Sequence, residues 1–297
     1  MVTIDPKDIE VPKLHRYLLG AVGPRPIAFA STIDENKVPN LAPFSFFNAF
    51  SANPPILVFS PARSGRTNTT KDTYNNVKKL PEVVINVVNY ELVHQMSLAS
   101  SPYPSDTDEF IKSGLTPIES EMVQPFRIKE SPVQFECKVN EVIELGNQGG
   151  AGNLIICEVL KIHIDESVLD EKGMIDQHKI DLVSRMGGNW YCRADENSMF
   201  EIPKPITTCG IGYDELPQDI LSSEVLSANN LGQLAGIEKF PDETDVNEYK
   251  LLELSELFLS LEEDAVQLEI EIHKRAKLLL EKNHLEEAWL TLLSFNN

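Results

Sequence analysis

The sequence predicts a mainly β (α+β) protein, in which a barrel or sandwich of short strands is followed by a helical extension. Short β-branched, apolar runs recur through the first two thirds of the chain with few helical segments between them. Over the last third, apolar positions such as Ala265, Leu268 and Ile272 recur at three- and four-residue steps, which is helix spacing. Neither G-x-G-x-x-G nor G-x-x-x-x-G-K-[ST] occurs, so no motif favours a Rossmann sheet or a P-loop protein.

Five segments carry strand signals and are bounded by turn residues. The expected strands are residues 27–32, 56–60, 83–88, 133–143 and 154–164. Because side chains alternate along a strand, the odd-numbered apolar residues from 133 to 139 are expected to share one face of the fourth strand. The even-numbered residues from 156 to 164, which are mostly apolar, are expected to share one face of the fifth.

Four segments carry helix signals. The expected helices are residues 72–80, 91–97, 265–279 and 281–293. For the first helix, Asp72 is expected to be the N-cap and Pro81 to end the helix. Residues 207–246 are polar and are expected to be irregular.

The charge of the chain is strongly negative and unevenly distributed. The 297 residues carry a formal net charge of −20, which argues against binding to nucleic acid or to an anionic membrane surface. Residues 201–297 hold 20 acidic and 7 basic residues, so most of the imbalance lies there. Together with Pro203 and Pro205, this asymmetry predicts two domains, residues 1–205 and an acidic, mainly helical extension of residues 206–297. The extension is expected to be a helical pair that packs on the barrel or on a partner subunit, or else an acidic docking surface for a protein partner.

The remaining compositional signals concern compartment and metal binding. The chain has no basic and apolar leader and no run of roughly 18 apolar residues, so a cytoplasmic protein without a membrane span is expected. The four cysteines are widely spaced, which gives neither a disulfide framework nor a zinc motif. The six histidines are dispersed and none forms an H-E-x-x-H motif, so no metal site is expected.

Three segments carry unusual chemistry. In residues 23–27 and 40–55, small polar side chains alternate with aromatic residues and prolines, a lining that suits a planar aromatic ligand, although core and turn residues also explain it. Residues 60–73 gather two arginines, a lysine and many hydroxyl groups before a helix, which suits a phosphate or a solvated loop. In residues 182–191, a Gly-Gly step precedes Trp190 and Tyr191, which suits close backbone approach or a simple turn.

These segments resemble the flavin reductase-like FMN-binding family with the split β-barrel fold. Within this family, the sequence is similar to the longer branch, which includes flavoredoxin and the flavin-reductase component of nitrilotriacetate monooxygenase. The matching motifs are GPRPIAFAST (23–32), PNLAPFSFFNAFSANPPILVFSP (39–61), KDTYNN (71–76), VVINVV (83–88), KIHIDE (161–166) and SRMGGNWY (184–191). They run in family order over about the first two hundred residues and leave the helical extension without an assignment.

The resemblance implies a noncovalent FMN in a barrel groove near a homodimer interface. The implied flavin contacts are Arg25, Pro26, Ile27, Ser45, Phe46, Phe47, Asn48 and Ser51, and the implied phosphate contacts are Ser60, Lys71, Asp72 and Thr73. Arg185, Trp190 and Tyr191 would close the site, from the same or the other subunit. Arg25 is also the candidate catalytic cation, because negative charge develops at flavin N1 and the C2 oxygen on reduction.

The implied activity is that of an NAD(P)H:flavin oxidoreductase, in which hydride passes from reduced nicotinamide to FMN N5. The alternative is an FMN electron carrier of the flavoredoxin type that a protein donor reduces, and the acidic surface favours docking of such a protein. A third interpretation is a flavin oxidase on a similar barrel, but its phosphate-binding motifs are not visible. A redox protein or a monooxygenase is the expected partner in addition to a second subunit.

Overall fold

The computed structural model describes residues 1–295, and these residues form two compact units. The first unit is Met1–Phe200 and the second begins at Glu201, five residues before the boundary expected from the two prolines. Each unit has hydrophobic clusters of its own, so each is described separately.

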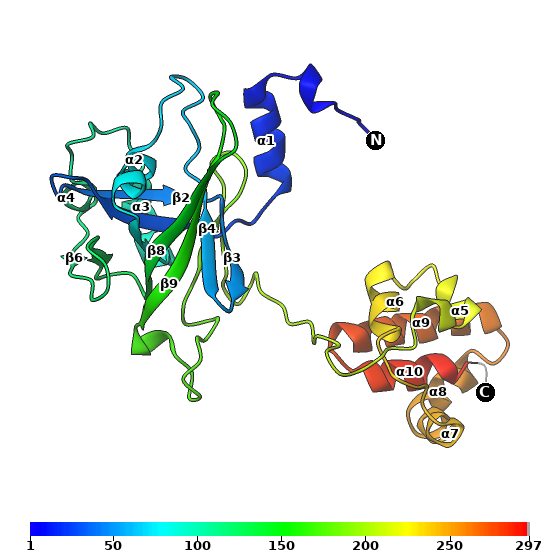
Figure 1. Cartoon of the computed structure of the whole chain (residues 1–297). Coiled ribbons are helices and arrows are strands. Elements are labelled where there is room, and N and C mark those ends of the chain that lie inside the picture. The colour runs from blue at the N-terminus through cyan, green and yellow to red at the C-terminus, as the bar shows by residue number, and fades with distance from the viewer. Residues whose placement is uncertain (296–297) are drawn as a thin grey trace. The chain divides into compact units, whose positions relative to one another are not determined.

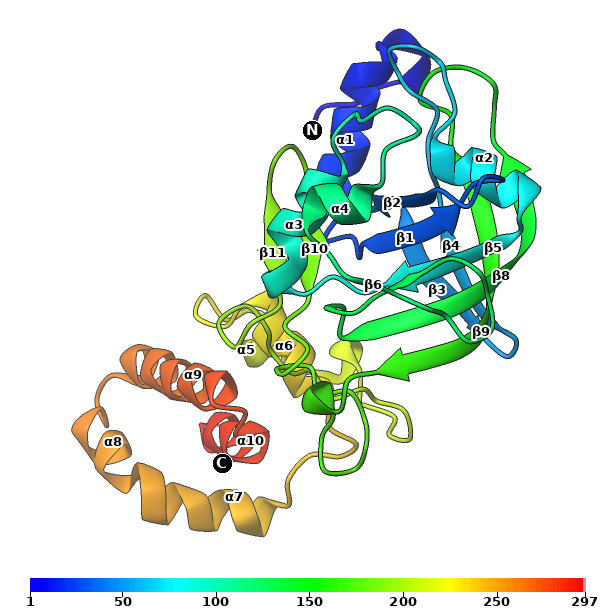
Figure 2. The ribbon, with the colours of Figure 1, turned by 90° about the vertical axis from the view of Figure 1, so that its left-hand side faces the viewer.

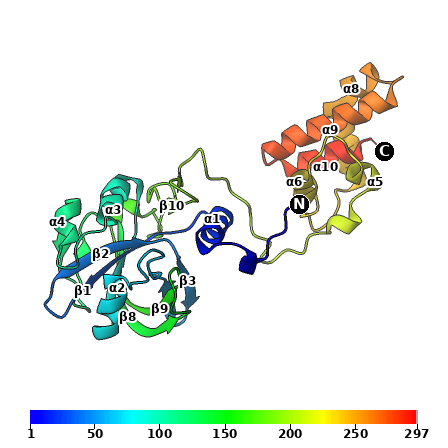
Figure 3. The ribbon, with the colours of Figure 1, turned by 90° about the horizontal axis from the view of Figure 1, so that it is seen from above.

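A seven-stranded antiparallel sheet forms the first unit, and its strands run in the order β2-β1-β5-β8-β9-β4-β3. The sheet curves from β2 round to β3 (Figure 3), and the β8–β9 hairpin is its longest element (Figure 1). The strands are β1 Ala28–Ile33, β2 Pro39–Phe44, β3 Phe47–Ala52, β4 Pro55–Phe59, β5 Glu82–Asn86, β8 Val133–Glu144 and β9 Asn153–Ile164. Two small hairpins accompany the sheet, β6 Pro117–Ile118 with β7 Arg127–Ile128, and β10 Val183–Arg185 with β11 Tyr191–Arg193.

The helices of the first unit are short. They are α1 Val11–Ala21, α2 Asp72–Lys79, α3 Val93–Ala99 and α4 Glu109–Ser113, with 3₁₀ turns at Pro6–Asp8, Tyr90–Leu92 and Glu166–Val168. One apolar cluster, which includes the fully buried Phe29 and Phe110, lies between β1 and β2 and the helices α3 and α4. A second cluster, which includes Phe59 and Ile155, joins β4, β5, β8 and β9. No helix among residues 1–295 is both long and apolar enough to span a membrane.

All five expected strands are present, with ends shifted by one or two residues. The strands β2 and β3 come from residues 39–52, for which the sequence predicted a ligand lining or core and turn residues but no strands. In β9 the expected face is correct, but Leu160, Ile162 and Ile164 on it remain 39–51% exposed, while the opposite face supplies the buried Ile155 and Cys157. The sequence could not show this, because apolar residues occur on both faces of β9.

Two local predictions were wrong. The N-cap of α2 is Lys71, which makes no side-chain cap bond, and Asp72 is instead the first residue of the helix, where its charge suits the helix dipole. Residues 207–246 are not irregular, since they contain α5 Gln218–Leu221, α6 Ala228–Leu234 and the start of α7 Glu243–Tyr249. A capping box at Ser227, which bonds with Asn230, begins α6 and was the overlooked signal.

The second unit is helical. After α7 come a π-helical turn at Lys250–Leu254, α8 Ser255–Ser260, α9 Ala265–Glu281 and α10 Leu285–Leu293 (Figure 2). Trp289 of α10 is fully buried at the centre, and its indole Nε1 donates to the carbonyl of Leu234 at 3.1 Å. The two expected C-terminal helices therefore pack together with α6 in one core.

Candidate functional site

Arg25 lies between α1 and β1 and is 5% exposed. Its Nη1 donates to the carbonyls of Leu19, at 2.8 Å, and of Val22 at the end of α1. Its Nη2 donates to the carbonyl of Met186 at 2.9 Å, and its Nε reaches the hydroxyl of Ser45 at 3.5 Å. Burial lowers the pKa of Arg25, as does the nearby charge of Arg185, but the group remains a cation at neutral pH. The guanidinium thus fixes three chain segments at once.

The β10–β11 hairpin meets Arg25 through the backbone as well. Arg25 N donates to Arg185 O at 3.0 Å, and Arg185 N donates to Arg25 O at 2.8 Å. Gly187 approaches α1 so closely that a Cβ there would lie 3.1 Å from the Cα of Gly20. Gly187 therefore serves close packing, whereas Gly188 has no neighbour within 4 Å of a Cβ and a φ of +60°, which suits a turn. Both interpretations of the Gly-Gly step hold, one for each glycine.

The side chains of this hairpin present cationic and aromatic groups. The guanidinium of Arg185 stacks 4.5 Å from the ring centre of Tyr191 and donates to the carbonyl of Trp190 at 3.0 Å. Trp190 itself is 78% exposed. A large exposed indole next to a fixed cation can stack on a planar ligand or on another chain.

Residues 45–46, which follow β2, connect Arg25 to Ser60 at the start of the loop between β4 and α2. Ser45 contacts Arg25, and the carbonyl of Phe46 accepts from Ser60 N at 2.9 Å. Farther along β3, Asn48 Oδ1 accepts from Ala49 N, and its amide nitrogen has no partner among the described residues. The flavin contacts that the resemblance implies in this region lie at different depths. Ile27 is buried, Ser45 and Phe47 are half-buried, and Pro26, Phe46, Asn48 and Ser51 are exposed.

The hydroxyl-rich loop between β4 and α2 is held in shape by its own polar groups. Arg63 donates from Nε to Asn68 Oδ1 at 2.9 Å and from Nη2 to Asn68 O at 2.7 Å. Arg63 is therefore a structural residue of the loop. Arg66 and Lys71 are exposed and have no carboxylate partner among the described ion pairs.

Ser60 and Thr73 are buried at the two ends of this loop. Ser60 Oγ accepts from Asn153 N at 3.0 Å, and Thr73 Oγ1 accepts from Asn40 Nδ2 at 3.0 Å. The same Asn40 amide also donates to Thr32 Oγ1 at 3.0 Å. Each hydroxyl keeps its own proton for a further acceptor.

A glycine-rich segment, residues 147–153, packs against the loop and was missed by the sequence analysis. A Cβ at Gly152 would lie 2.8 Å from Ser60 Oγ, which would force a shift, and one at Gly149 would lie at a tight 3.0 Å from Ser64 O. Asn153 is 1% exposed, and its Oδ1 accepts no hydrogen bond. The run N-Q-G-G-A-G-N was the available signal.

These residues fit a ligand that carries a phosphate and hydroxyl groups. The unpaired cations Arg66 and Lys71 and the uncapped N-terminus of α2 supply positive potential for an anion. The buried, unpartnered Oδ1 of Asn153 is an acceptor that a ligand hydroxyl would satisfy. Among residues 1–295, no group of three or more His, Cys, Asp or Glu side chains is arranged to hold a metal ion.

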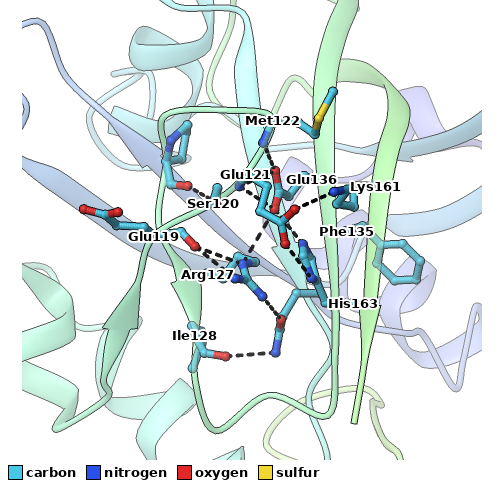
Figure 4. Close-up of polar contacts among 12 residues, drawn as sticks. Glu119, Ser120, Glu121, Met122, Arg127, Ile128, Phe135, Glu136, Lys161 and His163 are labelled. Carbon is cyan, nitrogen blue, oxygen red and sulfur yellow. Dashed lines mark hydrogen bonds and ion pairs between the residues drawn. The ribbon is translucent and has the colours of Figure 1, made fainter. Parts of the chain in front are cut away.

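A separate polar cluster lies on β8 and β9, around the fully buried carboxylate of Glu136 (Figure 4). It accepts from the backbone N–H of Glu121 and of Met122 and contacts His163 Nε2 at 2.6 Å. Burial alone would raise the pKa of Glu136, but these hydrogen bonds and the histidine hold it below its usual value. The cluster ties the loop between β6 and β7 to the sheet and shares no residue with the three site segments.

The curved antiparallel sheet with its short helices is a split barrel, and the three contacting segments line one region of it. A family model described as "Flavin reductase like domain" matches residues 21–181, which is more than half of the chain. The chain therefore belongs to the flavin reductase-like family.

Relatives match about two thirds of the chain. An uncharacterised protein of Aquifex aeolicus is 37% identical over 188 residues, which are 63% of this chain and 93% of that protein. The crystal structure of nitrilotriacetate monooxygenase component B from Bacillus cereus is 30% identical, with a TM-score of 0.64 over 68% of this chain and 98% of that one. Flavoredoxin of Desulfovibrio vulgaris shares the fold, with a TM-score of 0.54 and 22% identity over 63% of this chain and 93% of that one.

Proposed function

We propose that this protein is an NAD(P)H:flavin oxidoreductase that binds FMN noncovalently. The observation that carries the proposal is the junction at Arg25, which hydrogen-bonds Ser45, Met186 and Arg185. Arg25 and Ser45 lie within the residues that the flavin reductase-like family model matches. Bound FMN would accept a hydride at N5 and pass electrons onward, which needs no obligatory protein base. The protein then has to bind, orient and shield the ring.

We assign the FMN phosphate to the loop between β4 and α2. Ser60, Lys71, Asp72 and Thr73 are the proposed contacts, the last two through the backbone N–H groups of the first turn of α2, with Arg66 as a further cation. The Asn153 side chain is the proposed partner of a ribityl hydroxyl. A cationic loop can hold the phosphate of FMN although the chain is acidic, because binding depends on local donors.

We assign the isoalloxazine ring to the backbone of Arg25, Pro26 and Ile27 and to the segment from Ser45 to Asn48, with Ser51 farther along β3. The guanidinium of Arg25 donates to three backbone carbonyls, so its proposed role is to position these segments while its charge favours negative charge on the reduced ring. Arg185, Trp190 and Tyr191 are proposed to close the site.

A homodimer is part of the proposal. Phe50 on β3 is 67% exposed, and Leu160 and Ile162 on β9 are 41% and 51% exposed. The strand β3 is an edge of the sheet, and β9 lies between β8 and β4. Exposed apolar side chains of this kind on a sheet are typical of a surface that another chain covers. A second subunit would bury it beside the proposed flavin site.

An FMN electron carrier is the second candidate function, because the acidic second unit favours docking of a basic redox protein. A monooxygenase component is the other proposed partner, in keeping with the Bacillus cereus relative. One experiment separates the two functions: the FMN-loaded protein is mixed with NADH or NADPH without oxygen. Loss of the visible flavin absorbance within the mixing time supports the reductase, whereas an unchanged spectrum with both nucleotides contradicts it.

A further inference from the structure

The second unit contains a groove of about 520 Å³ between the α7–π-helix segment on one side and α9 and α10 on the other. The family model ends at residue 181, so the groove lies outside the flavin reductase-like domain. Its floor is formed by the half-buried Tyr249, Leu279 and Leu290. In Figure 2, α10 lies between α9 and the α7–α8 segment.

The rim of the groove is acidic. Four carboxylates line it, on Asp245, Glu248, Glu253 and Glu287, against the single cation Arg275. Arg275 pairs with Glu253 at 3.5 Å, so it offsets only one of the four charges. The surrounding unit adds to the same potential, because residues 201–297 hold 20 acidic and 7 basic residues. A bound partner would therefore meet negative charge on both sides of an apolar floor.

An exposed leucine extends the apolar floor to the rim. Leu252 is 73% exposed and lies on the π-helical turn at Lys250–Leu254. The turn displaces the register of the helix, and such turns occur often at functional sites. When an apolar side chain of a partner covers an exposed aliphatic side chain at the edge of a groove, apolar surface is removed from water, and this favours binding.

We propose that this groove binds an amphipathic helix of a partner protein, with lysine or arginine residues on either side of an apolar stripe. Helix-in-groove recognition needs an apolar trough for residues at i, i+3 or i+4 and i+7, and flanking charges set orientation and specificity. A small-molecule pocket would enclose its ligand and would be lined mostly by apolar groups, whereas carboxylates make up much of this open lining. The partner chemistry is thus basic and amphipathic.

The test uses the full-length protein and a fluorescent 18-residue peptide of leucine and lysine with leucine at helical spacing. Fluorescence anisotropy measures its dissociation constant, and a leucine–glutamate peptide of the same pattern is the charge control. The basic peptide is expected to bind and the acidic one is not. If neither peptide binds, or both bind equally, the proposal is overturned.

Two pairs of matched variants locate the binding. Asp245→Asn with Glu248→Gln removes two rim charges, and Glu262→Gln with Glu263→Gln removes two exposed charges outside the groove. The rim pair is expected to weaken binding about fivefold or more, and the control pair less than twofold. If both pairs weaken peptide binding equally, the peptide responds only to the overall negative charge of the unit, and a site in the groove is refuted.

The second matched pair tests the apolar contact. Leu252→Ser removes an exposed leucine of the groove, and Leu259→Ser removes one that is 74% exposed elsewhere in the unit. Both variants should keep the circular dichroism spectrum of the parent, because neither leucine is part of the core. Only Leu252→Ser is expected to weaken binding, by about threefold or more. No effect of Leu252→Ser would contradict the proposed docking mode.

Discussion

Arg25 donates a hydrogen bond to the carbonyl of Met186, across 161 positions of sequence, at 2.9 Å. This bond joins the start of β1 to the β10–β11 hairpin, and the same guanidinium holds the end of α1. A buried cation of this kind is costly to leave unpaired, so all three segments depend on one another.

Arg25→Lys should therefore loosen the whole junction. Lysine keeps the charge but cannot place donors on several carbonyls in a fixed plane. We expect a loss of about 2–4 kcal/mol in the free energy of unfolding and at least tenfold weaker FMN binding. Urea denaturation and flavin titration measure the two effects. Arg16→Lys, on an exposed position of α1, is the control and should change neither quantity.

The phosphate assignment predicts a difference between two flavins. Arg66→Ala and Lys71→Ala should each weaken FMN binding by about tenfold, because each removes a cation near a dianion. They should leave riboflavin binding almost unchanged, since riboflavin has no phosphate. Titration of both ligands into each variant checks this, with Lys129→Ala, an exposed lysine outside the loop, as control. Equal losses of affinity for both flavins would contradict the assignment of the FMN phosphate to this loop.

The Glu136 cluster predicts a pH-dependent contribution to stability. Because its pKa is lower in the folded than in the unfolded chain, Glu136 stabilises the protein above the unfolded carboxyl pKa, and this contribution is lost as the pH falls through the folded value. His163, Arg127, Glu121 and Lys161 surround it and complete the charge network (Figure 4).

Glu136→Gln should lower the free energy of unfolding at neutral pH by about 2–4 kcal/mol, because an amide cannot accept all of these bonds. The variant should also lose less stability than the parent on acidification. Chemical denaturation between neutral and acidic pH measures both effects. Glu119→Gln changes an exposed carboxylate of the same loop and should behave as the parent does.

The proposed homodimer predicts that one charge on β9 is enough to separate the subunits. Ile162→Glu places a carboxylate in the middle of the exposed apolar face, where dimerisation would bury it without a partner. Light scattering should report a dimer for the parent and a monomer for the variant. Leu98→Glu, at a position on α3 that is 46% exposed, should leave the parent's mass unchanged. A monomeric parent would disprove this assignment.

Much of the first unit could be predicted from the sequence, because its strands are β-branched runs with clear ends. The three chemically unusual segments that the sequence marked also contact one another in the structure, through the bonds of Arg25 with Ser45 and Arg185 and of Ser60 with Phe46. Their junction was not predictable, since the carbonyls of Leu19, Val22 and Met186 that Arg25 binds carry no side-chain signal. Likewise, the pairing of Glu136 with His163 depends on strand register, and a list of dispersed histidines could not show it.

The separate cores of the two units have a thermodynamic consequence. Trp289 and its neighbours form a cluster made only of residues from the second unit, whereas the clusters around Phe29 and Phe59 contain only residues of the first. Calorimetry should then resolve two melting events instead of one. A ligand stabilises only the unit that binds it, so added FMN should raise one melting temperature while a basic helical peptide raises the other.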